Sequence, residues 1–215
     1  MTADRRHRLV AVEGIDGSGK STLISTLVER LGPGARAERL SPRMAGVFRE
    51  LVDEPSGGLE RYQDVVPGDL RHGAYLVDAI AQFHYLAEEY DANDWLLFDR
   101  WLTTYRVYCS GRSVHDEWYA RLEAALPRPD LLIHVRTPPP VAFERIRRRG
   151  DWTVDHWSED RLMADLERLD AAYTRALADV PHVAVDGSLP AEEVADHVQS
   201  LLLGLATGTG TEDAG

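Results

Sequence analysis

The segment Gly14–Ser21 reads GIDGSGKS and carries the residue types that bind a phosphate chain. It fits the pattern G-x-x-x-x-G-K-[ST], in which backbone N–H groups surround the phosphates, the lysine reaches their end and the hydroxyl binds magnesium. Lys20 is the only lysine among 24 basic residues, and arginine cannot replace a compact ammonium where space is tight. A glycine-rich turn with a purely structural role is the alternative. The spacing predicts a nucleoside triphosphate site formed by Gly14, Gly17, Ser18, Gly19, Lys20, Ser21 and Thr22.

A second pair of charged residues, Asp99 and Arg100, follows the apolar run WLLF at residues 95–98. A phosphoryl-transfer site needs a carboxylate at the end of a neighbouring strand, where it holds magnesium directly or through water. The guanidinium of Arg100 would face the same opening and could hold an acceptor phosphate through two hydrogen bonds. The alternative is that Asp99 caps a helix and that Arg100 is a surface charge. The first interpretation makes Ser21 and Asp99 the ligands of Mg²⁺.

Short apolar runs and longer helical patterns alternate along the chain. For the phosphate loop to meet Asp99 and Arg100, these elements must place both segments at one edge of a sheet. The strands are predicted at residues 9–13, 95–98, 131–135 and 182–185. The helices are predicted at residues 22–31, 43–53, 70–90, 115–125, 139–149, 159–179 and 190–204. Strands that are apolar on both faces indicate an α/β fold, in which helices cover both faces of a parallel sheet. We expect one domain over residues 1–205 and a flexible tail over 206–215.

The composition excludes several classes of protein. The 215 residues carry a formal net charge of -12, which repels nucleic-acid backbones, so no nucleic acid is expected as a partner. No run approaches twenty apolar residues, so no membrane-spanning helix is predicted. Cys109 is the single cysteine, which excludes an internal disulfide and a zinc site built from several cysteines. The start MTADRRHR lacks the apolar region of a signal peptide, and we therefore expect a cytoplasmic protein.

Four stretches of the chain resemble the thymidylate kinase family of nucleoside monophosphate kinases, which have a P-loop NTPase-type sheet. They are VEGIDGSGKSTL at 12–23, the D-R-aromatic segment from Asp99 to Tyr108, residues 129–150, and VDGSLPAEEVADHV at 185–198. The resemblance implies ATP and Mg²⁺ as cofactors, a small nucleotide as acceptor, a short lid at about 149–158, and a homodimer. It further implies that Asp16 faces the sugar 3′-hydroxyl of the acceptor. Its other implied acceptor contacts are Arg49, Arg100, Thr104 and Tyr108.

The base pocket departs from the family pattern. In the family, the helix before the D-R strand carries an aromatic residue and an arginine that read thymine, but residues 72–97 contain no arginine. Tyr75, Gln82, Phe83 and His84 are the available candidates, and an aromatic stripe at this spacing is also typical of a core. Cys109 stands where glutamine or threonine is usual. The acceptor is therefore expected to be dTMP or a related pyrimidine nucleotide, with another small acceptor left open.

The transition-state cation is expected from the lid, because the basic residue that some family members carry in the loop is replaced by Gly17. Arg145 and Arg149 share one helix face, which makes Arg149 the first candidate, Arg145 its support and Arg147 the reserve. Two other functions stay open. A kinase of a free nucleoside or other hydroxyl acceptor would need a base, for which Asp99 or Glu13 is available. A non-catalytic nucleotide-binding switch is the third interpretation.

Overall fold

The computed structural model describes residues 7–109 and 116–208, and its centre is a five-stranded parallel sheet. The strands are β1 (Arg8–Glu13), β2 (Ala35–Arg39), β3 (Trp95–Asp99), β4 (Leu131–Arg136) and β5 (Val183–Asp186). Their spatial order is β2-β3-β1-β4-β5, so β1 lies at the centre between β3 and β4. Val12 pairs in register with Asp99 on one side and Ile133 on the other. The carboxyl ends of β1 and β3 therefore meet, as the predicted α/β fold requires.

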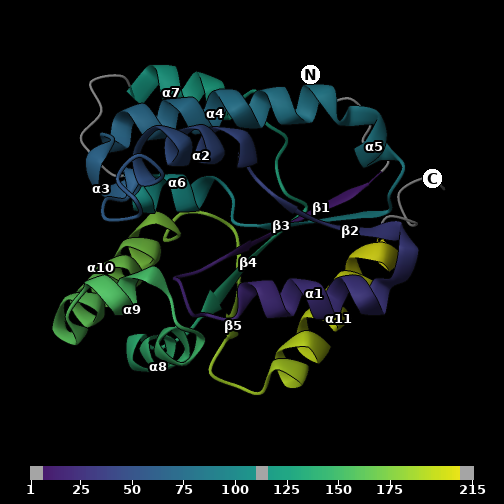
Figure 1. Ribbon diagram of the computed structural model, residues 1–215. Helices are drawn as coiled ribbons and strands as arrows, with labels where there is room; N and C mark the ends of the chain where they lie inside the picture. The colour runs from purple at the N-terminus through teal and green to yellow at the C-terminus, as the bar shows by residue number, and fades with distance from the viewer. Residues whose placement is uncertain (1–6, 110–115, 209–215) are drawn as a thin grey trace.

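Alternate residues of β1 enter two separate apolar clusters, one on each face of the sheet. Leu9 and Ala11 join the cluster beneath α4 (Gly68–Tyr85), α6 (Leu102–Tyr108) and α10 (Glu159–Ala176). Val10 and Val12 join the cluster beneath α1 (Lys20–Leu31) and α11 (Ala191–Gly208). Figure 1 shows α1 and α11 below the sheet and α4 above it. The prediction of a parallel sheet with helices on both faces is confirmed.

One strand, β2, is absent from the prediction. Its sequence ARAER alternates small and charged residues and has no apolar run. The strand lies at the edge of the sheet and pairs only with β3, so its residues are half-buried or exposed rather than fully enclosed. An edge strand with charged side chains is a common protection against pairing with other chains, and it gives no apolar signal.

The remaining helices refine the predicted boundaries. The helix expected at 43–53 divides into α2 (Pro42–Phe48) and a π-helical turn, η2 (Arg49–Asp53), and the one expected at 70–90 divides into α4 and α5 (Ala87–Asp91). The expected helices at 115–125 and 139–149 correspond to α7 (Asp116–Glu123) and α8 (Pro139–Arg149). Three short helices were not expected, namely α3 (Tyr62–Val65), α6 and α9 (Trp152–His156), and neither was the 3₁₀ turn at Gly32–Gly34.

The C-terminal helix extends further than the pattern predicts. Helix α11 continues to Gly208, so residues 206–208 are helical and do not begin the predicted tail. The rest of that tail, residues 209–215, lies outside the described part of the chain. Over residues 7–109 and 116–208, no helix is both long and apolar enough to span a membrane.

Candidate active site

The loop from β1 to α1 passes tightly beneath neighbouring backbone. Gly14 and Gly17 have φ values of 148° and 77°, a region that side chains with a Cβ rarely enter. A Cβ on Gly17 would lie 2.5 Å from the carbonyl oxygen of Ala142 in α8, and one on Gly14 would lie 2.6 Å from that of Val135. The loop therefore needs glycine at both positions. The packing against α8 also explains why no basic side chain can occupy position 17.

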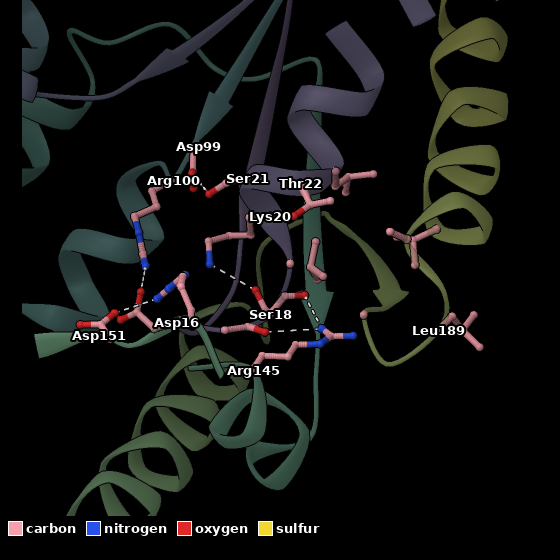
Figure 2. A pocket seen from close by; sticks show the side chains of 18 of the residues that line it. Asp16, Ser18, Lys20, Ser21, Thr22, Asp99, Arg100, Arg145, Asp151 and Leu189 are labelled. Atoms are coloured by element: carbon pink, nitrogen blue, oxygen red, sulfur yellow. Dashed lines mark hydrogen bonds and ion pairs between the residues drawn. The ribbon is translucent and has the colours of Figure 1, made fainter. Parts of the chain in front are cut away.

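A cavity of about 560 Å³ opens above this loop (Figure 2). The loop, the ends of β3 and β2, helix α8 and the β5–α11 connection all contribute to its wall. Its lining residues are Asp16, Gly17, Ser18, Gly19, Lys20, Ser21, Thr22, Leu23, Arg39, Asp99, Arg100, Val135, Arg145, Arg149, Asp151, Gly187, Leu189, Ala191 and Val194. The cavity thus brings the predicted phosphate loop, Asp99, Arg100 and two arginines of α8 to one place.

Lys20 lies at the base of this cavity with only 5% of its surface exposed. Its Nζ donates to the carbonyl oxygen of Ile15 at 2.8 Å and to Ser18 Oγ at 3.2 Å. Burial, followed by the positive charge of Arg100, lowers the pKa of Lys20 to about 7. The ammonium is therefore held by the loop itself and lacks a carboxylate in direct contact among the described residues.

This pKa predicts a proton linkage. Near pH 8 much of Lys20 is neutral in the free protein, and the negative charges of a bound triphosphate raise its pKa. We expect ATP binding at pH 8 to take up about one proton and binding at pH 6 to take up much less, because Lys20 is already protonated there. Calorimetry in two buffers of different ionisation enthalpy measures the uptake. Lys20→Met is the control, and equal uptake by that variant would contradict the prediction.

Ser21 and Asp99 meet across the ends of α1 and β3. Ser21 Oγ donates to Asp99 Oδ2 at 2.7 Å, while Asp99 Oδ1 is buried and has no hydrogen-bond partner in the described ranges 7–109 and 116–208. Arg39 Nη2 lies 3.9 Å from Asp99 Oδ2. A hydroxyl and a carboxylate with a free oxygen are the hard ligands that Mg²⁺ prefers. The residues present therefore fit the metal predicted for this position.

Arg100 holds the opposite side of the cavity. Its φ is 78°, an unusual value for a residue with a side chain, and its backbone N–H donates to the carbonyl oxygen of Val12 at 2.9 Å. One guanidinium nitrogen, Nη2, pairs with Asp16 Oδ1, and Figure 2 shows this contact. The other, Nη1, is buried without a partner among the described residues. A buried donor of this kind is available to an anionic ligand.

Asp16 receives a second contact from Tyr108, whose hydroxyl donates to Oδ2 at 2.9 Å. The Tyr108 ring also lies 4.9 Å from the guanidinium carbon of Arg100. Burial raises the pKa of Asp16, but the charges of Arg100 and Lys20 outweigh it and lower the pKa to about 2. Asp16 is therefore ionised and positioned by side chains from α6 and the β3–α6 turn.

Helix α8 brings Arg145 and Arg149 to the cavity. Arg145 Nη1 donates to the carbonyl oxygens of Gly17 and Ser18 at 3.4 and 3.3 Å, so it braces the loop. Arg149 Nη2 pairs with Asp151 Oδ2 at 2.7 Å, and its side chain is 60% exposed. Arg147 instead pairs with Glu144 and lies outside the cavity lining. The two arginines on the predicted helix face are thus the two that face the cavity.

Comparison with known proteins agrees with this geometry. The sequence model of the family described as Thymidylate kinase matches residues 12–198. The chain belongs to the thymidylate kinase family. The probable thymidylate kinase of Metallosphaera sedula is 30% identical over 203 residues, which cover 94% of this chain and 95% of that protein. The thymidylate kinase of Xanthomonas campestris is 29% identical over 189 residues, covering 86% of this chain and 78% of that protein. That of Pyrobaculum aerophilum, named as probable, is 27% identical over 197 residues, covering 90% and 95%.

Two residues of this thymidylate kinase family member form a buried helix cap. Glu13 is fully buried, and its Oε1 accepts from the backbone N–H of Trp101 at 3.0 Å and of Thr104 at 3.1 Å. Its Oε2 accepts from the hydroxyls of Thr104 and Tyr173. Burial raises the pKa of Glu13. The family resemblance implies a substrate contact for Thr104, and in this structure its hydroxyl joins Glu13 to the start of α6.

Two predicted base-pocket residues, Tyr75 and Gln82, lie in the core and not in the cavity lining. The Gln82 amide donates to Tyr90 Oη at 2.9 Å and to the Arg39 carbonyl at 3.0 Å, and its Oε1 accepts from the Ser41 N–H at 3.0 Å. Gln82 is thus fully engaged in fixing the β2–α2 turn. The core face of α4 and a ligand-facing stripe have the same helical spacing, so the sequence could not separate them.

The other predicted pocket residues lie at different depths. Phe83 is half-buried against Phe98 and Trp101, His84 is exposed, and Cys109 is buried. Arg49 is exposed at the first residue of η2 and does not line the cavity. These side chains therefore do not meet Arg100 in one cavity of the structure as it stands.

Asp151 was not among the predicted site residues, although it lines the cavity and neutralises Arg149. Asp151 directly follows Gly150, which ends α8 with a positive φ of 70°. A carboxylate just beyond a helix that ends in four basic residues within five positions was the available signal. Leu189 and Val194 were missed as well, since apolar residues near a helix start carry no distinctive mark.

Proposed function

We propose that this chain transfers the γ-phosphoryl group of ATP to a nucleoside 5′-monophosphate, namely dTMP or a related pyrimidine nucleotide. The observation that carries the proposal is Nη1 of Arg100, a buried donor that has no hydrogen-bond partner within residues 7–109 and 116–208 and lies in the same cavity as the phosphate loop. A triphosphate on the loop leaves this nitrogen available to a second anionic group. A phosphorylated acceptor supplies that group, and a free hydroxyl does not.

The transfer requires alignment of two phosphates and cancellation of their charge, with little covalent chemistry by the protein. Lys20 and the loop N–H groups hold the donor, and Ser21 and Asp99 would hold Mg²⁺, which supplies positive charge to the donor phosphates when bound. Arg100 holds the acceptor phosphate, and Arg49 approaches it after movement of η2. Arg149, at the start of the lid (residues 149–158), stabilises the migrating group, and Arg145 of α8 supports it by bracing the loop. An acceptor phosphate oxygen is already nucleophilic and needs no general base.

The two rival functions are less consistent with the side chains present. A kinase of a free hydroxyl needs a carboxylate base, but Glu13 accepts hydrogen bonds on both oxygens inside the core. Asp99 faces Ser21 in a metal-binding arrangement. A non-catalytic switch has no need of the arginines of α8 that line the cavity.

An ATP-consumption screen against nucleosides and their 5′-monophosphates tests the proposal. We expect turnover with dTMP or another pyrimidine monophosphate, and at least about a hundredfold lower kcat/KM with each matching nucleoside. Lys20→Met is the blank for contaminating kinases. Turnover confined to unphosphorylated acceptors would contradict the proposal and favour the hydroxyl-kinase function.

Asp16 is proposed to read the sugar 3′-hydroxyl of the acceptor, because its ionised carboxylate is fixed beside Arg100. We expect Asp16→Ala to lower the preference for 2′-deoxy over 2′,3′-dideoxy monophosphates by about tenfold, a loss of one charged hydrogen bond. The KM for ATP should change much less. The ratio of kcat/KM for the two acceptors measures the preference in both proteins, and an unchanged ratio would assign Asp16 to bracing the loop alone.

The homodimer is proposed to form through α4. Leu70, Val77 and Tyr85 share one face of this helix and are 59%, 53% and 77% exposed. Exposed apolar residues in one stripe are typical of a contact surface. We expect Val77→Asp to convert a dimer to a monomer in sedimentation velocity, whereas Arg168→Ala on the surface of α10 should leave the dimer intact. A wild type that sediments as a monomer would contradict this part.

The cytoplasmic location and the absence of nucleic-acid partners stay predictions.

A further inference from the structure

The backbone turn at Arg100 is held from the end of the central strand, β1. Arg100 has a φ of 78°, and its backbone N–H donates to the carbonyl oxygen of Val12 at 2.9 Å. Glu13 Oε1 accepts from the next N–H, that of Trp101, at 3.0 Å and from that of Thr104 at 3.1 Å. A left-handed backbone at a residue with a Cβ is strained and persists only where the surrounding contacts hold it. Glu13 therefore supplies two of the contacts that hold the turn.

Tyr173 of α10 holds the second oxygen of Glu13. Its hydroxyl donates to Glu13 Oε2 at 3.3 Å and lies 2.7 Å from Thr104 Oγ1, which also donates to Oε2. The Tyr173 side chain is fully buried and does not line the cavity. Its ring stacks on His134 of β4 with centres 5.6 Å apart. A ring enclosed in a close-packed core presents its hydroxyl in one position, so Tyr173 fixes the carboxylate that fixes the turn.

Two groups that face the acceptor side of the cavity are built on this turn and on the helix that follows it, α6. The Arg100 side chain begins at the strained residue, and its Nη2 pairs with Asp16 while its Nη1 is buried without a partner among the described residues. Tyr108 of α6 donates to Asp16 Oδ2 at 2.9 Å. The Tyr108 ring meets that of Tyr173 at an angle of 73°, with centres 6.4 Å apart. Tyr173 therefore bears on Arg100 through its hydroxyl and on Tyr108 through its ring.

The use of a carboxylate at this helix start has a cost that a simple cap avoids. Burial raises the pKa of Glu13, because the core disfavours the charged form. Helix α10 is capped instead by the neutral hydroxyl of Ser158, which accepts from the N–H of Arg161. A buried polar group that is fully hydrogen-bonded specifies one arrangement of its neighbours. The four hydrogen bonds on Glu13 are therefore explained better by fixed geometry at Arg100 than by capping alone.

We propose that Glu13 and Tyr173 are positioning residues that aim the guanidinium of Arg100 at the acceptor phosphate. The inference rests on the phosphoryl transfer proposed above, in which Arg100 holds that phosphate. The Tyr173 hydroxyl keeps Glu13 Oε2 in place. Glu13 Oε1 in turn keeps the N–H groups of Trp101 and Thr104 in place, and the turn that they enclose sets the direction of the Arg100 side chain. Helix α10 thereby contributes to acceptor binding although none of its residues lines the cavity.

The test removes the Tyr173 hydroxyl and compares a monophosphate with its own nucleoside. The two probes are the best monophosphate of the screen above, expected to be dTMP, and the same nucleoside without the phosphate. We expect Tyr173→Phe to raise the Kd of the monophosphate by about fivefold, the scale of one lost hydrogen bond. The Kd of the nucleoside and that of ATP should each change by less than about twofold, because neither places an acceptor phosphate on Arg100. Calorimetry measures all three constants, and a generally loosened fold would weaken all three alike.

Glu13→Gln is the conservative variant, and Tyr90→Phe is the matched control. The glutamine oxygen still accepts from both N–H groups and its amide donates to the two hydroxyls, so the monophosphate Kd should stay within about twofold of the wild type. Tyr90 is buried like Tyr173, and its hydroxyl accepts from Gln82 at 2.9 Å. Its ring lies 6.3 Å from that of His7, before the start of β1 and thus at the opposite edge of the sheet from the cavity. We expect Tyr90→Phe to leave all three constants unchanged.

An unchanged monophosphate Kd in Tyr173→Phe overturns the inference, and so does an equal rise in the Kd of the nucleoside. A rise in Tyr90→Phe or in Glu13→Gln as large as that in Tyr173→Phe overturns it as well, because the effect would then not come from the hydrogen bonds at Glu13. Turnover in the same wild-type preparation separates the two proposals. An active enzyme whose Tyr173→Phe variant binds the monophosphate normally refutes the positioning alone, while a wild type inactive on every monophosphate refutes the proposed function and the positioning that rests on it.

Discussion

Lys20→Ala is expected to lower turnover by about two orders of magnitude or more, the scale of one lost charge contact in the transition state. The chain contains no second lysine, and Lys20 Nζ is already enclosed by the loop, with bonds to Ile15 and Ser18. No neighbouring ammonium can therefore take its place. Steady-state kcat with ATP and the best monophosphate measures the effect.

The fold should tolerate this change, because both partners of Nζ lie within the same loop and the bonds do not tie distant elements together. We expect the free energy of unfolding to change by about 1 kcal/mol, which denaturant titration measures. Arg30→Ala is the control on the same helix, since Arg30 pairs with Glu192 and Asp196 of α11, away from the cavity. Unchanged turnover in Lys20→Ala would mean that the loop is not the donor site.

The parts of the fold that the sequence predicted are those whose physical signal is local. Strands β1, β3 and β4 are buried on both faces, so most of their residues are apolar: β1 and β3 contain uninterrupted apolar runs, and that of β4 is broken only by His134. The phosphate loop is equally local, because its glycines and Lys20 lie within eight successive positions. Strand β2 gave no such signal, since an edge strand needs few apolar residues.

The site is built by contacts between residues that lie far apart in the sequence. Only the resemblance to a known family indicated that such residues belong to one site. Asp16 and Arg100 are 84 positions apart, and nothing in their spacing indicates that they pair. Helical periodicity placed Tyr75 and Gln82 on one face of α4 but gave no means to decide whether that face meets a ligand or the core. Residues 150–157 of the lid show no helical periodicity, because α9 is short and is held by the contact between Trp152 and Arg61. A contact between two distant segments leaves no periodic pattern in either of them.

The second large effect is expected at Arg149. The helix α8 offers two arginines to the cavity, but Arg145 is engaged with the carbonyl oxygens of the loop. Within the described part of the chain Arg149 is held only by Asp151, in a pair whose side chains are 60% and 35% exposed. Such a pair is worth about 0–1 kcal/mol, whereas one transition-state contact to a charged group contributes about 3–4 kcal/mol. The exchange of Asp151 for the migrating phosphoryl group is therefore favourable, and Arg149 is the cation free to make it.

Arg149→Ala should consequently lower kcat by about a hundredfold with little change in the dissociation constant of ATP, because the contact forms mainly in the transition state. Pre-steady-state kinetics and equilibrium titration of ATP measure the two quantities separately. Arg147→Ala is the control, since its side chain pairs with Glu144 outside the cavity and should leave both quantities unchanged. A variant that binds ATP weakly but keeps its turnover would assign Arg149 to ground-state donor binding. The charge on the migrating group would then have to be met by Arg145, which could do so only by releasing the carbonyl oxygens of Gly17 and Ser18.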